Sequence, residues 1–274
     1  MHFGRKKGMI RDGDYPSKSK KKEGEASVER NIHFDVTGLT DIAVRLAWAQ
    51  LEIFADDVEK IQVMAAGDES SVADLRIEIK DGALVVEQPQ YGLSLNIVDS
   101  HWMQVCIRVP RAWEQAIHLN TISGLLSARG LTGSTIVMDT ISADLRAVRV
   151  SAKELSLKTI SGDVRGEALA ANVLSVRSVS GSLSVNAAEA KVLKCNSISG
   201  EQDYHLADTF QSIDVVAVSG NVMIASPVET MNVAMRSVSG RVRAEGVVVT
   251  ESADAPKVRV TGVSAELKLI FTRK

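Results

Sequence analysis

The sequence has few of the residues that crosslink small folds or bind metals. It contains two cysteines, Cys106 and Cys195, outside any C-x-x-C motif, and five histidines scattered over 274 residues. Disulfide-rich and zinc-binding proteins need clusters of these residues. With 45% hydrophobic residues, the chain can bury a core without such crosslinks. We interpret both cysteines as buried small hydrophobic residues and expect neither a metal site nor a cofactor.

Long hydrophobic runs are also missing. No stretch approaches the roughly 18 apolar residues of a membrane span. The first 27 residues are interrupted by Arg, Lys, Gly and Asp, unlike the apolar core of a signal peptide. We therefore expect a cytoplasmic protein that is at most peripheral to a membrane.

Motifs that would indicate common enzyme classes are absent. The sequence has no G-x-G-x-x-G after a strand, no Walker motif, no calcium-binding repeat and no G-x-S-x-G. Asp144 and Asp163 lie one repeat apart and are the best candidates for a pair of catalytic carboxylates. Arg146 and Arg165 follow each of them by two residues, so a surface charge ladder is the preferred interpretation. We expect no enzymatic activity.

What the sequence does contain is a four-residue motif repeated at near-constant spacing. It reads T-I-S-G at residues 121–124, and its fourth position recurs after 19, 19, 19, 19, 20 and 20 residues, then after 22 in a looser copy ending at Gly262. Such a period is typical of stacked structural repeats. The candidate structural residues at the third and fourth positions are Ser123, Gly124, Ser142, Ser161, Gly162, Ser180, Gly181, Ser199, Gly200, Ser219, Gly220, Ser239 and Gly240.

Alternating apolar residues around the motif favour strands over helices. The second position is always β-branched, from Ile122 to Val238 and Val260, and an aliphatic residue usually follows four places later. An earlier apolar pair, such as Ile136 and Met138, is out of phase with it, so we expect a bend at the first motif residue. The pattern predicts an all-β solenoid of about eight rungs with a period of 19 to 22 residues. We expect its glycines to adopt positive φ or to allow close backbone approach.

The motif also places hydroxyl groups in columns. The first positions, mostly Thr or Ser, would form one column and the serines at the third position another. Hydroxyl columns can satisfy one another and the backbone, or they can bind glycans or ice. We favour the structural ladder, because a corner is not a flat binding surface.

Three segments follow from these patterns. Residues 120–274 form the repeats, with the alternating residues after Pro256 as a terminal closure. Residues 29–119 lack the period, hold the three tryptophans and a hairpin signal at Asp81-Gly82, and are expected to form an irregular β cap. Residues 1–28 are expected to be a disordered tail.

This tail is basic, whereas the rest of the chain is acidic. Its candidate membrane-contact residues are Arg5, Lys6, Lys7, Lys18, Lys20, Lys21 and Lys22. A cationic tail can serve only for solubility, or it can bind an anionic membrane weakly. The acidic body has no basic stripe with aromatic residues, so we expect no nucleic-acid partner.

The V-x-I-x-V-P segment at Val105–Pro110, followed by the serial S-G motifs, resembles the bacterial putative-adhesin family, a domain of unknown function with β-strand repeats. The resemblance implies a β-solenoid, links to the cell envelope or its stress response, and no catalytic residues. We therefore predict a non-catalytic binding or scaffolding protein with an unidentified protein or glycan partner. The alternatives are a carbohydrate-binding or polysaccharide-processing β-helix and a self-assembling scaffold.

Overall fold

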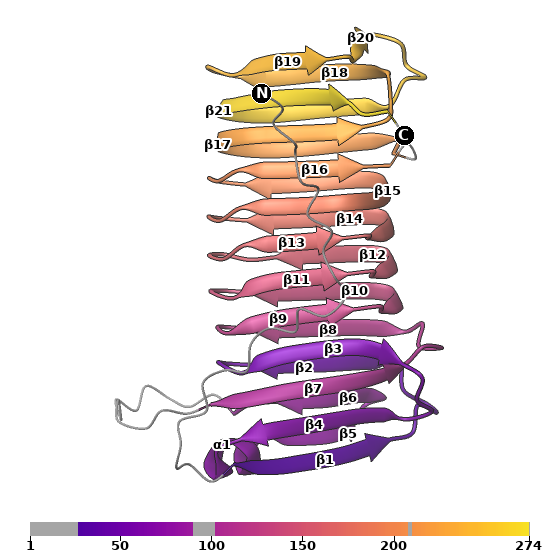
Figure 1. Ribbon diagram of the computed structural model, residues 1–274, viewed down its shortest axis with the longest axis vertical. Coiled ribbons are helices and arrows are strands. Elements are labelled where there is room, and N and C mark those ends of the chain that lie inside the picture. Colours follow the sequence, from indigo (N-terminus) through magenta and orange to yellow (C-terminus); the bar gives the residue numbers. More distant parts are fainter. Residues whose placement is uncertain (1–26, 90–101, 208–209, 274) are drawn as a thin grey trace, which may run out of the picture.

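A computed structural model of the chain describes residues 27–89, 102–207 and 210–273. These residues form one 21-stranded sheet and a six-residue helix, α1 (Glu69–Asp74). The sheet is wound into a flattened β-solenoid with two opposite faces, and Figure 1 shows its strands stacked from β1 to β20. The predicted all-β solenoid is confirmed.

The front face is the one turned toward the viewer in Figure 1, and the back face lies behind it. Three long strands contribute to both faces: β15 (Leu183–Ser197), β17 (Ser212–Ser226) and β21 (Lys257–Phe271). From the N-terminal end, the front face contains β1 (Val28–Phe34), β4 (Ile61–Gly67), β7 (Met103–Pro110), β3 (Gln50–Asp56), β9 (Leu125–Arg129), β11 (Asp144–Val148), β13 (Val164–Glu167), β15, β16 (Gln202–Leu206), β17, β21 and β19 (Arg241–Glu245). The back face contains β5 (Arg76–Lys80), β6 (Ala83–Glu87), β2 (Asp41–Leu46), β8 (Ala116–Thr121), β10 (Thr132–Thr140), β12 (Ser151–Lys158), β14 (Ala170–Ser178), β15, β17, β21, β18 (Thr230–Ser237) and β20 (Val248–Thr250).

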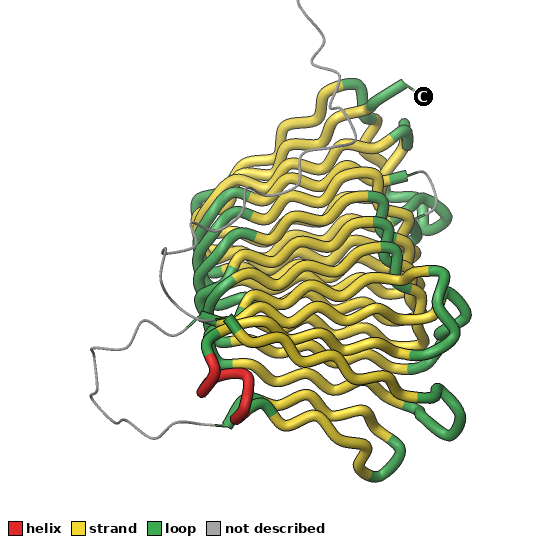
Figure 2. The backbone as a smooth tube through the Cα atoms, turned by 60° about the horizontal axis from the view of Figure 1, so that its bottom comes forward, coloured by secondary structure: helices red, strands yellow, loops and turns green. Residues whose placement is uncertain are grey.

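Each repeat forms one rung, and equivalent residues of consecutive rungs pair in parallel. Ile136 of β10 pairs with Ile117 below it and with Leu155 above it. Figure 2 shows the strands as stacked zigzags with the connecting turns gathered at their edges. Side chains that point inward therefore form continuous core columns, such as Leu126, Leu145, Val164 and Leu183, which are at most 1% exposed.

The bend expected at the first motif residue begins one residue later, directly after the strand ends. In the second repeat, Met138 and Thr140 both point inward, Asp139 points outward, and the chain bends from Ile141 to Ala143. Side chains therefore keep alternating between inward and outward positions, because the buried residue is the hydroxyl-bearing Thr140 and the apolar Ile141 is 43% exposed. The sequence interpretation that placed the β-branched residue in the core alternation is therefore wrong.

The buried hydroxyls hold the motif turns together. Thr121 Oγ1 donates to the carbonyl oxygen of Ser123 at 2.9 Å, and the hydroxyls of Ser178 and Ser197 make the same contact two residues on at 3.1 Å. A threonine or serine is tolerated in the core because its hydroxyl is satisfied by a carbonyl oxygen of the turn.

The glycine at the fourth position lets neighbouring turns stack. Gly181 has φ of +123° and Gly220 has φ of +125°. A Cβ atom at either residue would clash with the carbonyl oxygen of the equivalent glycine one rung earlier. Side chains are thus excluded both by backbone conformation and by space. The repeat that has Ala143 instead uses a different turn, in which Thr140 Oγ1 bonds to both the N–H and the C=O of Ala143.

The last rungs do not follow chain order. Strand β21 pairs with β17 on one side and with β18 and β19 on the other, so the C-terminal strand is inserted below the rung that precedes it in sequence. Val263 and Ala265, aligned with Val218 and Gly220, occupy the motif positions that the sequence assigned to Val260 and Gly262. The expected terminal closure is therefore wrong, because β18, β19 and β20 form that end.

The N-terminal region is more regular than an irregular cap and also departs from chain order. Strands β2 and β3 lie between the β8–β9 rung and strands β6 and β7, with all these pairings parallel. Antiparallel pairs β1–β4, β4–β7 and β5–β6 complete this end, where α1 also lies (Figure 1). The hairpin predicted at Asp81-Gly82 is confirmed, with φ of +51° and +78° at these residues.

The turn opposite the motif imposes a left-handed conformation at a 19-residue interval. Gly130, Arg149, Ala168 and Ala187 have φ between +52° and +66°. Only the first is glycine, and a residue with a Cβ atom in this region is strained by about 1–2 kcal/mol.

We predict that Ala168→Gly or Ala187→Gly stabilises the protein by about 0.5–1 kcal/mol, since relief of the strain exceeds the added unfolded-state entropy of glycine. Chemical denaturation monitored by circular dichroism measures this change. Ala234→Gly, at an exposed strand position without positive φ, is the control and should destabilise by a similar amount. Destabilisation by all three changes would show that the positive φ of Ala168 and Ala187 does not strain the backbone.

We predict that Thr140→Val and Thr159→Val have different effects on stability. Thr140 makes two hydrogen bonds with Ala143 in the core, whereas Thr159 Oγ1 is buried without a partner. Thr140→Val should destabilise by about 1–3 kcal/mol because it leaves buried backbone groups unsatisfied, and Thr159→Val should be neutral or stabilising. Equal losses in denaturant unfolding would show that the hydroxyls do not hold the turns.

Candidate functional site

The second motif position forms an exposed apolar column along the solenoid. Ile160, Val179 and Ile198 are 43, 42 and 51% exposed, and their rungs stack directly upon one another. We call the full set the motif column; its members are Ile122, Ile141, Ile160, Val179, Ile198, Val218, Val263 and Val238. A contiguous apolar surface of this kind is a candidate interaction site, unlike isolated exposed apolar residues.

A groove of about 300 Å³ runs beside the middle of this column on the back face. Its apolar walls come from four column members, which are Ile160, Val179, Ile198 and Val218, together with Val216, which is 47% exposed. The remaining lining residues are Lys158, Thr159, Arg177, Ser178, Asn196 and Ser197. The groove therefore combines aliphatic walls with two cations and no carboxylate.

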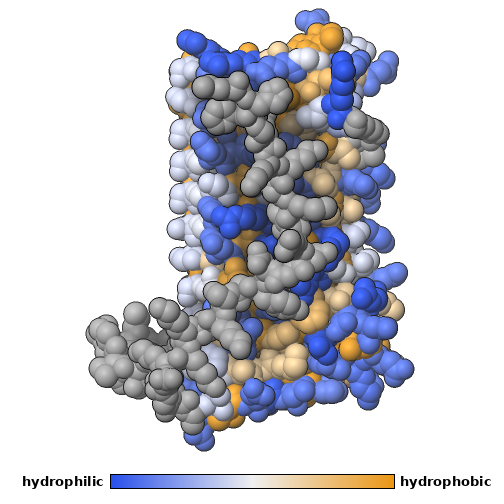
Figure 3. All heavy atoms as spheres, viewed as in Figure 1, coloured by the Kyte–Doolittle hydropathy of each residue, from blue (hydrophilic) through white to orange (hydrophobic). Residues whose placement is uncertain are grey.

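The motif serines and glycines predicted from the sequence lie at the turns beside the column. Ser199 Oγ donates to the carbonyl oxygen of Val179 at 3.3 Å, and Ser219 Oγ donates to that of Ile198 at 3.4 Å. The hydroxyls thus bond to the backbone of the adjacent rung, and Ser239 Oγ also contacts Ser264 Oγ at 2.9 Å. Figure 3 shows a row of residues of intermediate hydropathy, drawn nearly white, along the edge where these turns stack. The predicted membrane-contact residues of the tail lie outside the described residues.

Asp144 and Asp163 have contacts that serve the backbone. Asp144 Oδ1 accepts the N–H of Asp163 at 3.0 Å, and Asp163 Oδ1 accepts the N–H of Ser182 at 3.1 Å. Arg165 also pairs with Asp163 at 3.1 Å, as the charge-ladder interpretation predicted. These carboxylates connect consecutive rungs.

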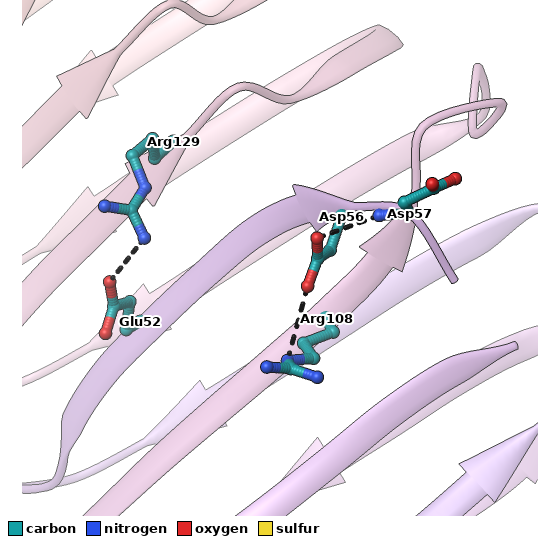
Figure 4. A network of polar contacts seen from close by, with 5 residues as sticks. All are labelled: Glu52, Asp56, Asp57, Arg108 and Arg129. Carbon is teal, nitrogen blue, oxygen red and sulfur yellow. Dashed lines mark hydrogen bonds and ion pairs between the residues drawn. The ribbon is translucent and has the colours of Figure 1, made fainter.

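A second polar cluster, shown in Figure 4, joins three strands of the front face. Glu52 pairs with Arg129 of β9 at 3.4 Å, and Asp56 pairs with Arg108 of β7 at 3.6 Å. Both guanidinium groups lie over the ring of Phe54, at 5.1 Å for Arg129 and 5.8 Å for Arg108. Because β3 is out of chain order, these contacts fix it between its neighbours, and we assign the cluster a structural role.

The two cysteines are not activated thiols. Burial raises the pKa of Cys195 to about 12, and burial together with the charge of Glu52 raises the pKa of Cys106 to about 11. Both are free and protonated at neutral pH. In the core near Cys195, the Tyr204 hydroxyl donates to Gln202 Oε1 at 3.2 Å, so the buried Gln202 carbonyl oxygen has a hydrogen-bond partner.

No cluster of three or more His, Cys, Asp or Glu side chains suited to a metal occurs within residues 27–89, 102–207 and 210–273. The described part of the chain also contains no helix of the length and hydrophobicity needed to cross a membrane.

Sequence reasoning found the motif but missed the site beside it. The signal was the unbroken β-branched residue at the second position, which we assigned to the core because apolar residues are usually buried. The three-residue spacing from the preceding apolar pair marked those side chains as outward, as the structure has them.

Comparisons with known proteins agree with this architecture. A putative adhesin from Parabacteroides distasonis superposes with a TM-score of 0.59 at 17% identity, covering 89% of this chain and 97% of its own. A putative adhesin from Bacteroides fragilis gives 0.56 at 13% identity, covering 90% and 98%. A putative lipid binding protein from P. distasonis gives 0.59 at 15% identity, covering 90% and 97%. These likenesses establish the fold.

No curated protein matches the chain by sequence. The model of the family described as Toastrack DUF4097 matches residues 39–269, which include every motif turn and all strands except β1 and the last residues of β21. The chain belongs to the Toastrack DUF4097 family.

Proposed function

We propose that the protein is a non-catalytic binding protein associated with the bacterial cell envelope, and that its groove binds an anionic lipid. The observation that carries the proposal is the motif column, whose aliphatic side chains stay exposed in rung after rung instead of entering the core. Burying this surface against a ligand would be favourable, at about 25 cal/mol per Å² of apolar area.

The lining of the groove suits an acyl chain. Ile160, Val179, Ile198, Val216 and Val218 provide aliphatic contact across four rungs, with no aromatic ring on which a sugar could stack. The lining also lacks the carboxylates that act as acid and base in polysaccharide cleavage. Lipid therefore fits this groove better than carbohydrate.

The charges at the groove favour an anionic headgroup. Lys158 is paired with Asp139 at 2.8 Å. Arg177, on the next rung, has no ion-pair partner among the residues that the structure describes. A free guanidinium beside an apolar groove is suited to a phosphate, to which it can donate two hydrogen bonds.

Two further points support an envelope role. One relative of the same fold is described as a putative lipid binding protein and others as putative adhesins. The basic residues before Val28 would add electrostatic attraction to an anionic membrane surface, and this attraction should weaken with salt.

We predict that the full chain co-sediments with phosphatidylglycerol vesicles more than with phosphatidylcholine vesicles. Replacing Ile160, Val179 and Ile198 together by Ser should weaken binding roughly tenfold or more, because one buried aliphatic side chain contributes about 1.5–3 kcal/mol. Arg177→Gln should reduce the preference for the anionic lipid. A salt series with the full chain and a chain beginning at Val28 separates the contribution of the tail.

Val249→Ser is the matched control, because Val249 is as exposed as Ile198, at 51%, but lies outside the groove. Equal binding by the wild type and the triple variant would refute the groove as the lipid site. Binding that disappears only when the tail is removed would place attachment in the tail instead.

A further inference from the structure

Exposed large hydrophobic side chains gather in only two kinds of place in the described structure. Nine belong to the motif column and its groove. The other five lie at the ends of the stack and are Val28, Ile79, Val242, Val248 and Val249. The ends are therefore a second apolar surface, separate from the groove.

The C-terminal end leaves a core column open. Val242 is aligned with Leu267 and Val222, which are each 1% exposed, yet Val242 itself is 38% exposed. Among the described residues, strand β19 pairs only with β21, and β20 pairs only with β18. Their outer backbone edges are thus available to a further strand.

The N-terminal end has the same character. Within the part of the chain that the structure describes, strand β5 pairs only with β6, and β1 on the front face pairs only with β4. Ile79 of β5 is 52% exposed although its partner Leu84 is fully buried. Each end therefore exposes strand edges and inward-facing aliphatic side chains.

The two ends have complementary steps. At the C-terminal end the back face extends one strand farther, because β20 lies beyond β18 while β19 is the last strand of the front face. At the N-terminal end the front face extends one strand farther, with β4 and β1 beyond β7 but only β5 beyond β6. Figure 1 shows β20 and β1 at these extremes. Stacking one copy upon another would place β1 against β19 and β5 against β20.

Charge also matches in this arrangement. Arg241, Arg243 and Glu245 point outward on β19, because Val242 and Ala244 are aligned with the core residues of β21. The outward side chains of β1 include Glu29 and His33. β1 runs in the same direction as β19, so one register places Arg241 opposite Glu29 and Glu245 opposite His33. Among the described residues, neither Arg241 nor Glu29 has an ion-pair partner within its own chain.

We propose that the ends of this protein bind each other head to tail, so that copies stack into a linear polymer with a continuous sheet. The contact is heterologous, which leaves a free end after every addition and does not close. Main-chain pairing along both faces provides the affinity, and the stepped ends fix the orientation.

Sedimentation velocity over a concentration series, with electron microscopy of stained particles, tests this proposal on the full chain. We expect species larger than one chain that grow with concentration. One variant blocks the C-terminal end with Val242→Lys and Val249→Lys, which are aligned with the buried Leu267 and Met231, and the other blocks the N-terminal end with Val28→Lys and Ile79→Lys. Inward-pointing lysine at an edge opposes strand addition. Each variant alone should be monomeric, and an equal mixture should form a dimer from its two unblocked ends.

A wild type that stays monomeric at every soluble concentration would overturn the proposal. So would a dimer formed by either blocked variant alone, because that contact would be symmetric, and so would a mixture without dimer. The control variant, Ser182→Lys with Asn221→Lys, adds the same charge in the middle of the stack and should assemble like the wild type. If a blocked variant fails to unfold cooperatively, Arg241→Glu and Glu29→Arg replace the two blocks. Each of these variants alone should be monomeric, and an equal mixture should polymerise again because every end then meets an opposite charge.

Discussion

Parallel backbone pairing between consecutive rungs is the interaction on which the rest of this structure depends. A rung of 19 residues cannot bury its own aliphatic side chains, so it is stable only when its neighbours cover both of its edges. This pairing requires every turn to fit into the spacing between strands. The glycine of the motif meets that requirement where turn backbones approach too closely for a Cβ atom, as at Gly181. The buried hydroxyl of the motif meets it by donating to a carbonyl oxygen of the turn, as Ser178 does to Ser180.

The same constraint explains where apolar surface remains exposed. Residues inside the stack are covered by equivalent residues above and below, whereas the second motif residue lies at a corner and points away from both faces. Small polar residues would satisfy the geometry there, yet all eight positions are Ile or Val. Since stacking does not demand that choice, binding is our proposed explanation for the column. Arg177 beside it would supply the charge that recognises an anionic ligand in that proposal.

The inserted strands at both ends show a second use of parallel pairing. Strand β21 enters below β18 and β19, and the β2–β3 pair enters below the first repeat rung. Each inserted strand is paired with a neighbour on both sides, so none of them leaves an unpaired backbone edge. The outermost strands are then short or antiparallel, and their stepped arrangement gives the two ends different, complementary shapes.

The sequence by itself determined the repeat, the strand class, the hairpin at Asp81-Gly82 and the special role of glycine, because period and turn chemistry are local properties of the chain. It identified Asp163 and Arg165 as a ladder for the same reason. Only the tertiary structure decided the insertion of β21, the alignment of Val263 with Val218, and the exposure of the motif column. Chain order does not fix spatial order when any parallel strand can pair with any exposed edge. An apolar side chain beside a buried threonine is likewise placed outside by the path of the turn and not by its own hydrophobicity.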